Sequence, residues 1–260
     1  MRLGFEVVRD SIMAATAQTL AEAGLPQSVL SRTFAGIGLA GTGMAGARET
    51  LETWGHPFAG AWFEGDAYIA FLGAFGGIEG GIVVAGTGSI GIAYLDKTIR
   101  VGGYGFPVSD EGSGAHIGVN ALRHALRTLD GRAEASAFSK EVLARFSNNA
   151  AMVTHWMKNA RPTDYASLAP LVAKHASAGD QAAHRIMQAA GTQIADLVQG
   201  LFKHAAPRVA LVGGLAAALR EYMPPEVASR LVAPEADPIA GGILLAKKKQ
   251  GASIAMSDPG

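Results

Sequence analysis

The chain of 260 residues contains no cysteine, which excludes disulfide bonds, thiol catalysis and cysteine-ligated metal sites. It has no excess charge of either sign, since 22 Lys and Arg balance 22 Asp and Glu. Electrostatics therefore gives no reason to expect a nucleic acid or a membrane as partner. Acidic residues interrupt the apolar pattern at the N-terminus, so we expect neither a signal peptide nor a membrane span, and we infer a cytoplasmic protein.

Glycine is the residue in excess, with 34 copies gathered in doublets and triplets beside apolar runs. Repeated strand-then-glycine loops are typical of backbone that approaches a ligand closely. They are equally typical of ordinary tight turns. The composition alone leaves both interpretations open, and the seven histidines show no spacing that predicts a metal site.

Hydrophobic periodicity predicts an α/β chain with a helical insert. The expected elements in chain order are a helix over 4–23, a strand over 33–41, a strand and helix within 61–75, a strand over 80–86, a hairpin over 90–103, a helix over 112–129, mostly helix over 134–205, a strand, glycine turn and helix over 208–223, and a last helix after Pro238. We expect residues 247–260 to form a solvated tail.

Residues 86–91 read GTGSIG, which matches the G-x-G-x-x-G pattern of dinucleotide-binding folds. In those folds the glycine loop opens a helix, whose N-terminus holds the pyrophosphate. Here the loop is followed by a run rich in Ile, Tyr and Val, which predicts a strand. A tight glycine turn between two strands can still bind phosphate through successive backbone N–H groups and the hydroxyls of Thr87 and Ser89.

This turn, followed by GGYGFPVSDEGSG (102–114) and VALVGGLA (209–216), resembles the sugar-kinase branch of the actin-like ATPase fold. The likeness is greatest to bacterial glucosamine and N-acetylglucosamine kinases of the BadF/BadG/BcrA/BcrD ATPase family, and it runs from Leu3 to about Ala246. The resemblance implies an α/β, ribonuclease-H-like fold of two lobes. We expect an N-terminal lobe over 1–105 and a C-terminal lobe with the helical insert over 106–260.

The resemblance also implies roles for individual residues. Asp66 would be the catalytic base that takes the proton of a sugar hydroxyl. The nucleotide and its phosphates would contact Gly86, Thr87, Gly88, Ser89, Gly213, Gly214 and Ala217. The sugar would contact Asp66, Ser89, Gly103, Asp110 and Glu111. No metal ligand is assigned.

Each role has a plainer alternative. Asp66, Asp110 and Glu111 stand at predicted helix starts, where carboxylates cap N–H groups or complement the helix dipole. Thr87 and Ser89 are also typical turn-stabilising hydroxyls, and Gly213-Gly214 is also a common tight turn. Tyr104 is compatible with packing on a sugar ring or with covering the core.

The implied activity is ATP-dependent phosphorylation of the 6-hydroxyl of glucosamine or N-acetylglucosamine, with Mg²⁺, in a homodimer. The D-G-G-G-T strand unit with which the family begins does not occur in the sequence. We therefore expect an incomplete N-terminal lobe with an open sheet edge. The alternative function is a catalytically impaired sugar-binding or regulatory member. An ATPase activator is a third reading, but activators of that kind hold an iron–sulfur cluster with cysteines, which are absent.

Overall fold

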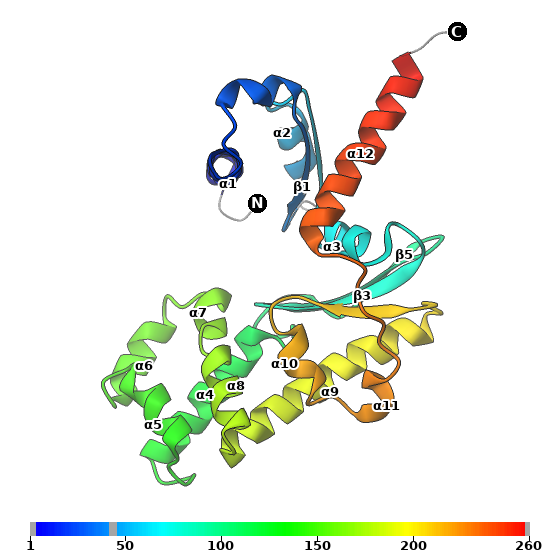
Figure 1. The fold of residues 1–260 in the computed structure, drawn as a ribbon. Coiled ribbons are helices and arrows are strands. Elements are labelled where there is room, and N and C mark those ends of the chain that lie inside the picture. Colours follow the sequence, from blue (N-terminus) through cyan, green and yellow to red (C-terminus); the bar gives the residue numbers. More distant parts are fainter. Residues whose placement is uncertain (1–3, 42–45, 258–260) are drawn as a thin grey trace. The chain divides into compact units, whose positions relative to one another are not determined.

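The computed structural model describes residues 4–41 and 46–257 (Figure 1). Its internal contacts divide the chain into two compact units. Unit 1 comprises Met1–Ile78 and Pro234–Gly260, and unit 2 comprises Glu79–Ala233. Unit 1 is thus assembled from both ends of the chain, and unit 2 is one continuous segment. No helix among the described residues is long and apolar enough to cross a membrane.

Unit 1 is built around two parallel strands, paired from Phe34 opposite Gly60 to Leu39 opposite Gly65. Small residues let its helices α3 and α12 approach closely. A β-carbon on Gly73 of α3 would collide with the backbone just before α12, and one on Gly241 of α12 would collide with the backbone of α3. The elements are α1 (Phe5–Glu22), η1 (Gln27–Arg32), β1 (Phe34–Leu39), α2 (Ala47–Glu52), β2 (Gly60–Gly65), α3 (Asp66–Phe75) and α12 (Pro238–Ser257).

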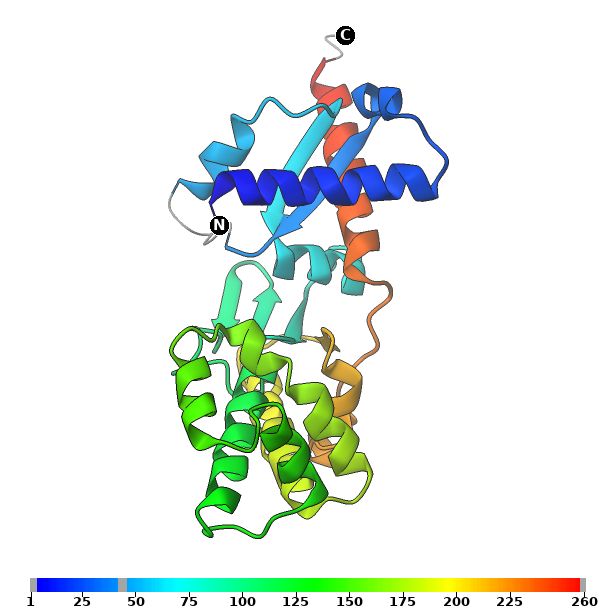
Figure 2. The same ribbon diagram turned by 90° about the vertical axis from the view of Figure 1, so that its left-hand side faces the viewer.

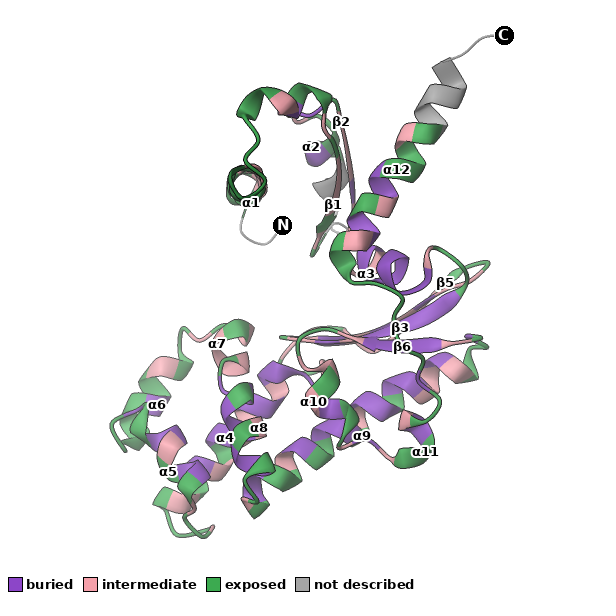
Figure 3. Cartoon of the chain, in the orientation of Figure 1, coloured by how far each residue is buried: buried purple, intermediate pink, exposed green. Residues whose placement is uncertain are grey.

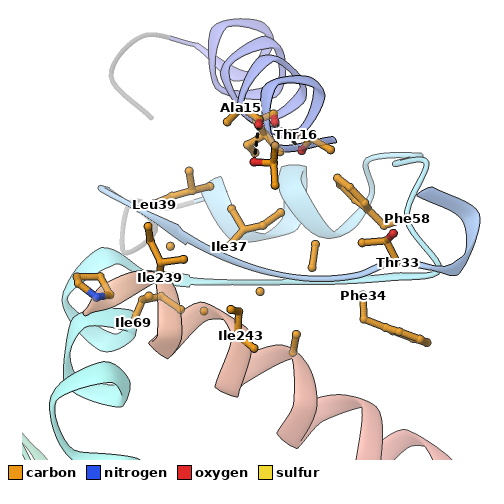
Figure 4. Close-up of a pocket in the computed structure, with 18 of the residues that line it drawn as sticks. Ala15, Thr16, Thr33, Phe34, Ile37, Leu39, Phe58, Ile69, Ile239 and Ile243 are labelled. Atoms are coloured by element: carbon orange, nitrogen blue, oxygen red, sulfur yellow. Dashed lines mark hydrogen bonds between the residues drawn. The ribbon is translucent and has the colours of Figure 1, made fainter. Parts of the chain in front are cut away.

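An apolar groove of about 970 Å³ runs along β1 in unit 1. Figure 4 shows side chains of β1 and α12 lining it, with α1 above them, and Figure 2 shows α1 crossing the two strands. Among the described residues, β1 pairs with β2 on one side only, and α1 has no buried residue. The groove therefore follows the free edge of β1.

Unit 2 contains a four-stranded sheet in the order β5-β4-β3-β6. The central strand β3 (Gly80–Ala85) is antiparallel to β4 (Ser89–Tyr94) and parallel to β6 (Val209–Val212), and β5 (Thr98–Val101) lies at the edge. Nearly all of β3 is buried, which explains its continuous apolar run, whereas β4 alternates buried and half-buried residues.

Helix α9 (Gln181–Lys203) packs on this sheet through a stripe of buried residues, coloured purple in Figure 3. Small residues again set the approach, because Gly81 and Gly91 both face Leu201 of α9. The remaining helices of unit 2 are α4 (Gly114–Leu129), α5 (Ala137–Ala144), α6 (Ala150–Met157), α7 (Pro162–Ala166), α8 (Ala169–Ser177), α10 (Ala216–Arg220) and α11 (Pro225–Ala228).

The elements expected from the sequence are confirmed, including the hairpin around Asp96-Lys97 and the strand that follows the GTGS turn. The tail expected over 247–260 is wrong in part, because α12 continues to Ser257. Lysine and glutamine are good helix formers, and Lys248 Nζ donates to Gly76 O of unit 1 over 2.9 Å. The first boundary between the two units lies between Ile78 and Glu79, not at the lobe boundary expected at 105. The division into two lobes stays a prediction.

Asp180 caps the N-terminus of α9 and joins it to α5. Its carboxylate accepts the N–H groups of Ala182, Ala183 and Phe138 over 3.0, 3.1 and 3.4 Å. Burial alone would raise the pKa of Asp180, but hydrogen bonds from Ser136 and from these N–H groups outweigh it and lower the pKa. The ionised cap therefore stabilises the fold at neutral pH, and this contribution is lost as the pH falls through the lowered pKa.

We predict that Asp180→Ala lowers the free energy of unfolding by about 1–2 kcal/mol, because it removes the cap. Asp180→Asn keeps most of the stability at pH 7, since asparagine caps equally well. Denaturant titration of both variants measures this. The matched control is Asp196→Ala, which removes an exposed carboxylate from the same helix. Equal stability of Asp180→Ala and Asp196→Ala would contradict the capping role.

Candidate functional site

The GTGS turn joins the antiparallel strands β3 and β4 and is tied to the start of α4. Gly86 N–H donates to Gly88 O over 3.0 Å within the turn. The first two N–H groups of α4, on Gly114 and Ala115, donate to Gly86 O and Thr87 O over 2.8 and 3.1 Å. A helix N-terminus commonly binds an anion, but here it fixes the carbonyl side of the turn.

The opposite side of this turn has free donors. Among the described residues, no acceptor bonds the backbone N–H of Thr87 or Gly88, or the Thr87 hydroxyl. Thr87 is exposed. Adjacent unbonded N–H groups beside an exposed hydroxyl can cradle an anion. The geometry therefore fits the phosphate contact predicted for Thr87.

A second glycine turn lies against the first. Leu215 N–H donates to Ala85 O over 3.0 Å, and Gly213 approaches the same carbonyl so closely that any β-carbon would collide with it. Gly213 also has a left-handed φ of 102°, which favours glycine. Both turns follow the carboxyl ends of neighbouring parallel strands, where α/β sheets bind ligands. Gly214 and Ala217 are exposed beside this contact.

The acidic loop over 102–113 supplies a carboxylate to the GTGS turn. Asp110 is one of its left-handed residues, with φ 67°. Its Oδ1 accepts Gly105 N–H over 3.2 Å, and its Oδ2 lies 2.9 Å from the position that a β-carbon on Gly88 would take. A side chain at position 88 would therefore displace the Asp110 carboxylate.

Ser89 links the turn to this loop. Its side chain is buried, and its hydroxyl donates to Glu111 O over 2.7 Å. The Glu111 carboxylate is exposed and accepts the Ser109 hydroxyl over 3.3 Å. Gly103 packs directly on Ile90 of β4, where a side chain would not fit. Direct contacts of Ser89, Gly103 and Glu111 with a ligand stay predictions.

Tyr104 does not cover the core, which answers one of the two alternatives left open by the sequence. The residue is 76% exposed, and the guanidinium of Arg100 lies 4.7 Å from the centre of its ring. It is available to pack on a ligand from the surface of the loop.

Asp66 belongs to unit 1 and directly follows the carboxyl end of β2. It is the first residue of α3, whose N-cap is Gly65. Its Oδ1 accepts Ala67 N–H over 2.9 Å, and the side chain is exposed. The carboxylate thus stabilises the first turn without occupying the cap position, and it keeps acceptor sites open to solvent. The N-cap is thus Gly65 rather than Asp66, and the catalytic role of Asp66 stays a prediction.

No three His, Asp or Glu side chains converge as a metal site within the part of the chain that the structure describes. The sequence did not single out Ala115 and Leu215, whose backbone N–H groups tie the turns together. Side-chain identity carries no signal for a backbone contact of this kind, so only the spatial neighbourhood of β3, β6 and α4 reveals it.

The sequence profile of the BadF/BadG/BcrA/BcrD ATPase family matches residues 1–246. The chain is 33% identical to glucosamine kinase GspK from Vibrio cholerae serotype O1, over 95% of this chain and 85% of that protein. It is 31% identical to an N-acetylmuramic acid/N-acetylglucosamine kinase from Clostridium acetobutylicum, over 50% of this chain and 44% of that protein. A crystal structure of a candidate N-acetylglucosamine kinase from Chromobacterium violaceum matches with 34% identity and a TM-score of 0.86, covering 94% of this chain and 86% of that one. The expected actin-like fold class is thereby confirmed.

We predict that Thr87 contacts a nucleotide phosphate. Replacing its hydroxyl with a methyl group in Thr87→Val removes one donor to a charged group, which is worth roughly a ten- to hundredfold change in ATP affinity. Isothermal titration with a non-hydrolysable ATP analogue measures this. Thr98→Val, at an exposed position of β5, is the control. Unchanged affinity in Thr87→Val would show that the phosphates bind elsewhere.

Proposed function

The chain belongs to the BadF/BadG/BcrA/BcrD ATPase family, and on that premise we propose that it is an ATP-dependent kinase of the 6-hydroxyl of an amino sugar. The observation that carries the proposal is the contact between the two glycine turns through Leu215 N–H and Ala85 O. It gathers free backbone donors at one end of the sheet, beside the carboxylate of Asp110. The names of the two relatives that this chain matches over most of their length support an amino sugar as the substrate class.

The β- and γ-phosphates of ATP would bind the N–H groups of Thr87 and Gly88 and the Thr87 hydroxyl. Gly213, Gly214 and Ala217 would lie along the nucleoside, because glycine and alanine leave room for a flat ligand next to the backbone. Phosphoryl transfer depends mainly on positioning and on neutralising charge. The bonds from α4 to the turn hold these donors in place before the nucleotide binds.

The carboxylates would orient the sugar. Asp110 and Glu111 would accept hydrogen bonds from sugar hydroxyls, and the exposed ring of Tyr104 is available for the apolar face of the pyranose. Asp66 would accept the proton of the 6-hydroxyl as its oxygen attacks the γ-phosphorus and the bond to the β,γ-bridging oxygen breaks, so that ADP leaves. It is exposed, and among the described residues it accepts one hydrogen bond, from Ala67 N–H, which leaves acceptor sites for this role.

Mg²⁺ would neutralise part of the phosphate charge when it is bound with the nucleotide. Magnesium is usually held by substrate phosphates and one or two carboxylates rather than by a protein cage. The lack of a converging carboxylate cluster among the described residues is compatible with this mode of binding. Assembly as a homodimer and residence in the cytoplasm remain predictions.

We predict that Asp66→Asn lowers kcat about 10²- to 10⁴-fold, because asparagine cannot take the hydroxyl proton. Asparagine still accepts Ala67 N–H, so the melting temperature is expected to stay the same. Sugar affinity is expected to change less than kcat. Coupled ATP-turnover assays, calorimetry and thermal melts separate these quantities.

The control is Asp237→Asn, which changes a carboxylate that accepts Ala240 N–H at the start of α12 in the same unit. A stable Asp66→Asn protein that keeps most of its kcat would reduce Asp66 to a helix-start residue. Sugar binding without turnover in the unmodified protein would instead support the catalytically impaired alternative.

We predict a higher kcat/KM for glucosamine than for N-acetylglucosamine. The segments FPVSDEGSG and RPTDY are similar to segments of glucosamine kinases. The ammonium group of glucosamine is attracted to the exposed carboxylate of Glu111, whereas the acetamido group of N-acetylglucosamine is neutral. Glu111→Gln is expected to reduce the preference. Turnover assays on both sugars decide the question, and faster turnover of the acetylated sugar reverses the assignment.

A further inference from the structure

The acidic loop over 102–113 has little regular secondary structure to hold it. Gly102, Gly103, Gly105, Asp110 and Gly112 all have left-handed φ angles. Such a loop keeps one conformation only when individual tethers fix it. Ser89 ties it to the GTGS turn through Glu111 O, and Arg100 of β5 ties it through Gly102 O over 3.0 Å.

A further tether is the imidazole of His116. Gly112 N–H donates to His116 Nδ1 over 3.2 Å, and Gln193 Oε1 of α9 lies 3.0 Å from the same nitrogen. Gly112 is buried, and a β-carbon there would lie 2.7 Å from Ala190 O of α9. The loop is therefore pressed against α9 at the point where the histidine holds it.

Hydrogen-bond chemistry fixes the roles of these groups. A backbone N–H can only donate, so Nδ1 must be an unprotonated acceptor and the ring proton lies on Nε2. The amide of Gln193 can turn so that its NH₂ group faces Nδ1, since its oxygen and nitrogen are interchangeable in shape. Nδ1 has one lone pair, which the N–H groups of Gly112 and Gln193 would then share.

We infer that His116 is a positioning residue for the sugar-binding loop, acting through Gly112 to hold Asp110 and Glu111 in register with the GTGS turn. The inference rests on the proposed function, because it assigns Asp110 and Glu111 to the sugar. The glycine turns make no bond to the His116 side chain among the described residues, so we expect its loss to affect the sugar side of the site more than the nucleotide side.

The variants His116→Leu and His116→Asn separate positioning from folding. Leucine removes the acceptor at similar volume and leaves a buried N–H unbonded, whereas asparagine places Oδ1 where Nδ1 lies. Loss of an acceptor for a buried donor predicts a rise of about five- to a hundredfold in KM for the sugar, with the KM for ATP changed less than twofold. His116→Asn is expected to recover sugar KM to within about threefold of the unmodified protein. His184→Leu, an exposed histidine near the start of α9, is the control.

Amide hydrogen exchange supplies a readout that does not depend on turnover. We expect faster exchange in His116→Leu over 103–113 but not in β3 or β4, and normal exchange in His116→Asn. An equal rise of both KM values, failure of asparagine to restore sugar KM, or unchanged exchange in the loop would overturn the inference. If the unmodified protein phosphorylates no amino sugar, the proposed function fails, while the exchange data still decide whether His116 fixes the loop.

Discussion

The parallel pairing of β3 with β6 is the contact on which the candidate site depends. It joins two strands that lie far apart in the chain, with all the helices from α4 to α9 between them. Because the strands run in the same direction, their carboxyl ends meet at one edge of the sheet. Each is followed there by a glycine turn, and the bond from Leu215 N–H to Ala85 O ties the two turns together. Without this pairing, each would be an isolated tight turn.

Helices α4 and α9 convert this edge into a rigid site. The first N–H groups of α4 are used on the carbonyls of the GTGS turn, and α9 packs against both the sheet and the acidic loop. The glycines at 81, 112 and 200 face side chains or backbone so closely that a β-carbon would force a neighbour to shift. Close packing of this kind transmits a change in one element to its neighbours.

Unit 1 contains a parallel strand pair with no further strand beside it among the described residues. Its strands β1 and β2 present Asp66 at their carboxyl end, as the strands of unit 2 present their turns. The other edge of β1 borders an apolar groove that α1 and α12 line without filling. Burial of apolar side chains drives folding, so this region gains less from packing than unit 2, whose sheet and helices share one continuous core.

The sequence by itself determined the order of the elements, the hairpin at GTGS, and the family to which the chain is similar. Those features depend on local patterns: apolar periodicity, β-branched runs and glycine spacing. The tertiary structure decided where Ser89, Asp66 and Tyr104 lie and what they contact. Ser89 is buried and holds the acidic loop, Asp66 follows the helix cap, and Tyr104 stands in solvent. It also revealed His116, whose partner Gly112 is a backbone group, and the helical extension of α12 through a lysine-rich run. A residue type predicts which bonds a side chain can make, but the partner that is within reach depends on how distant segments pack.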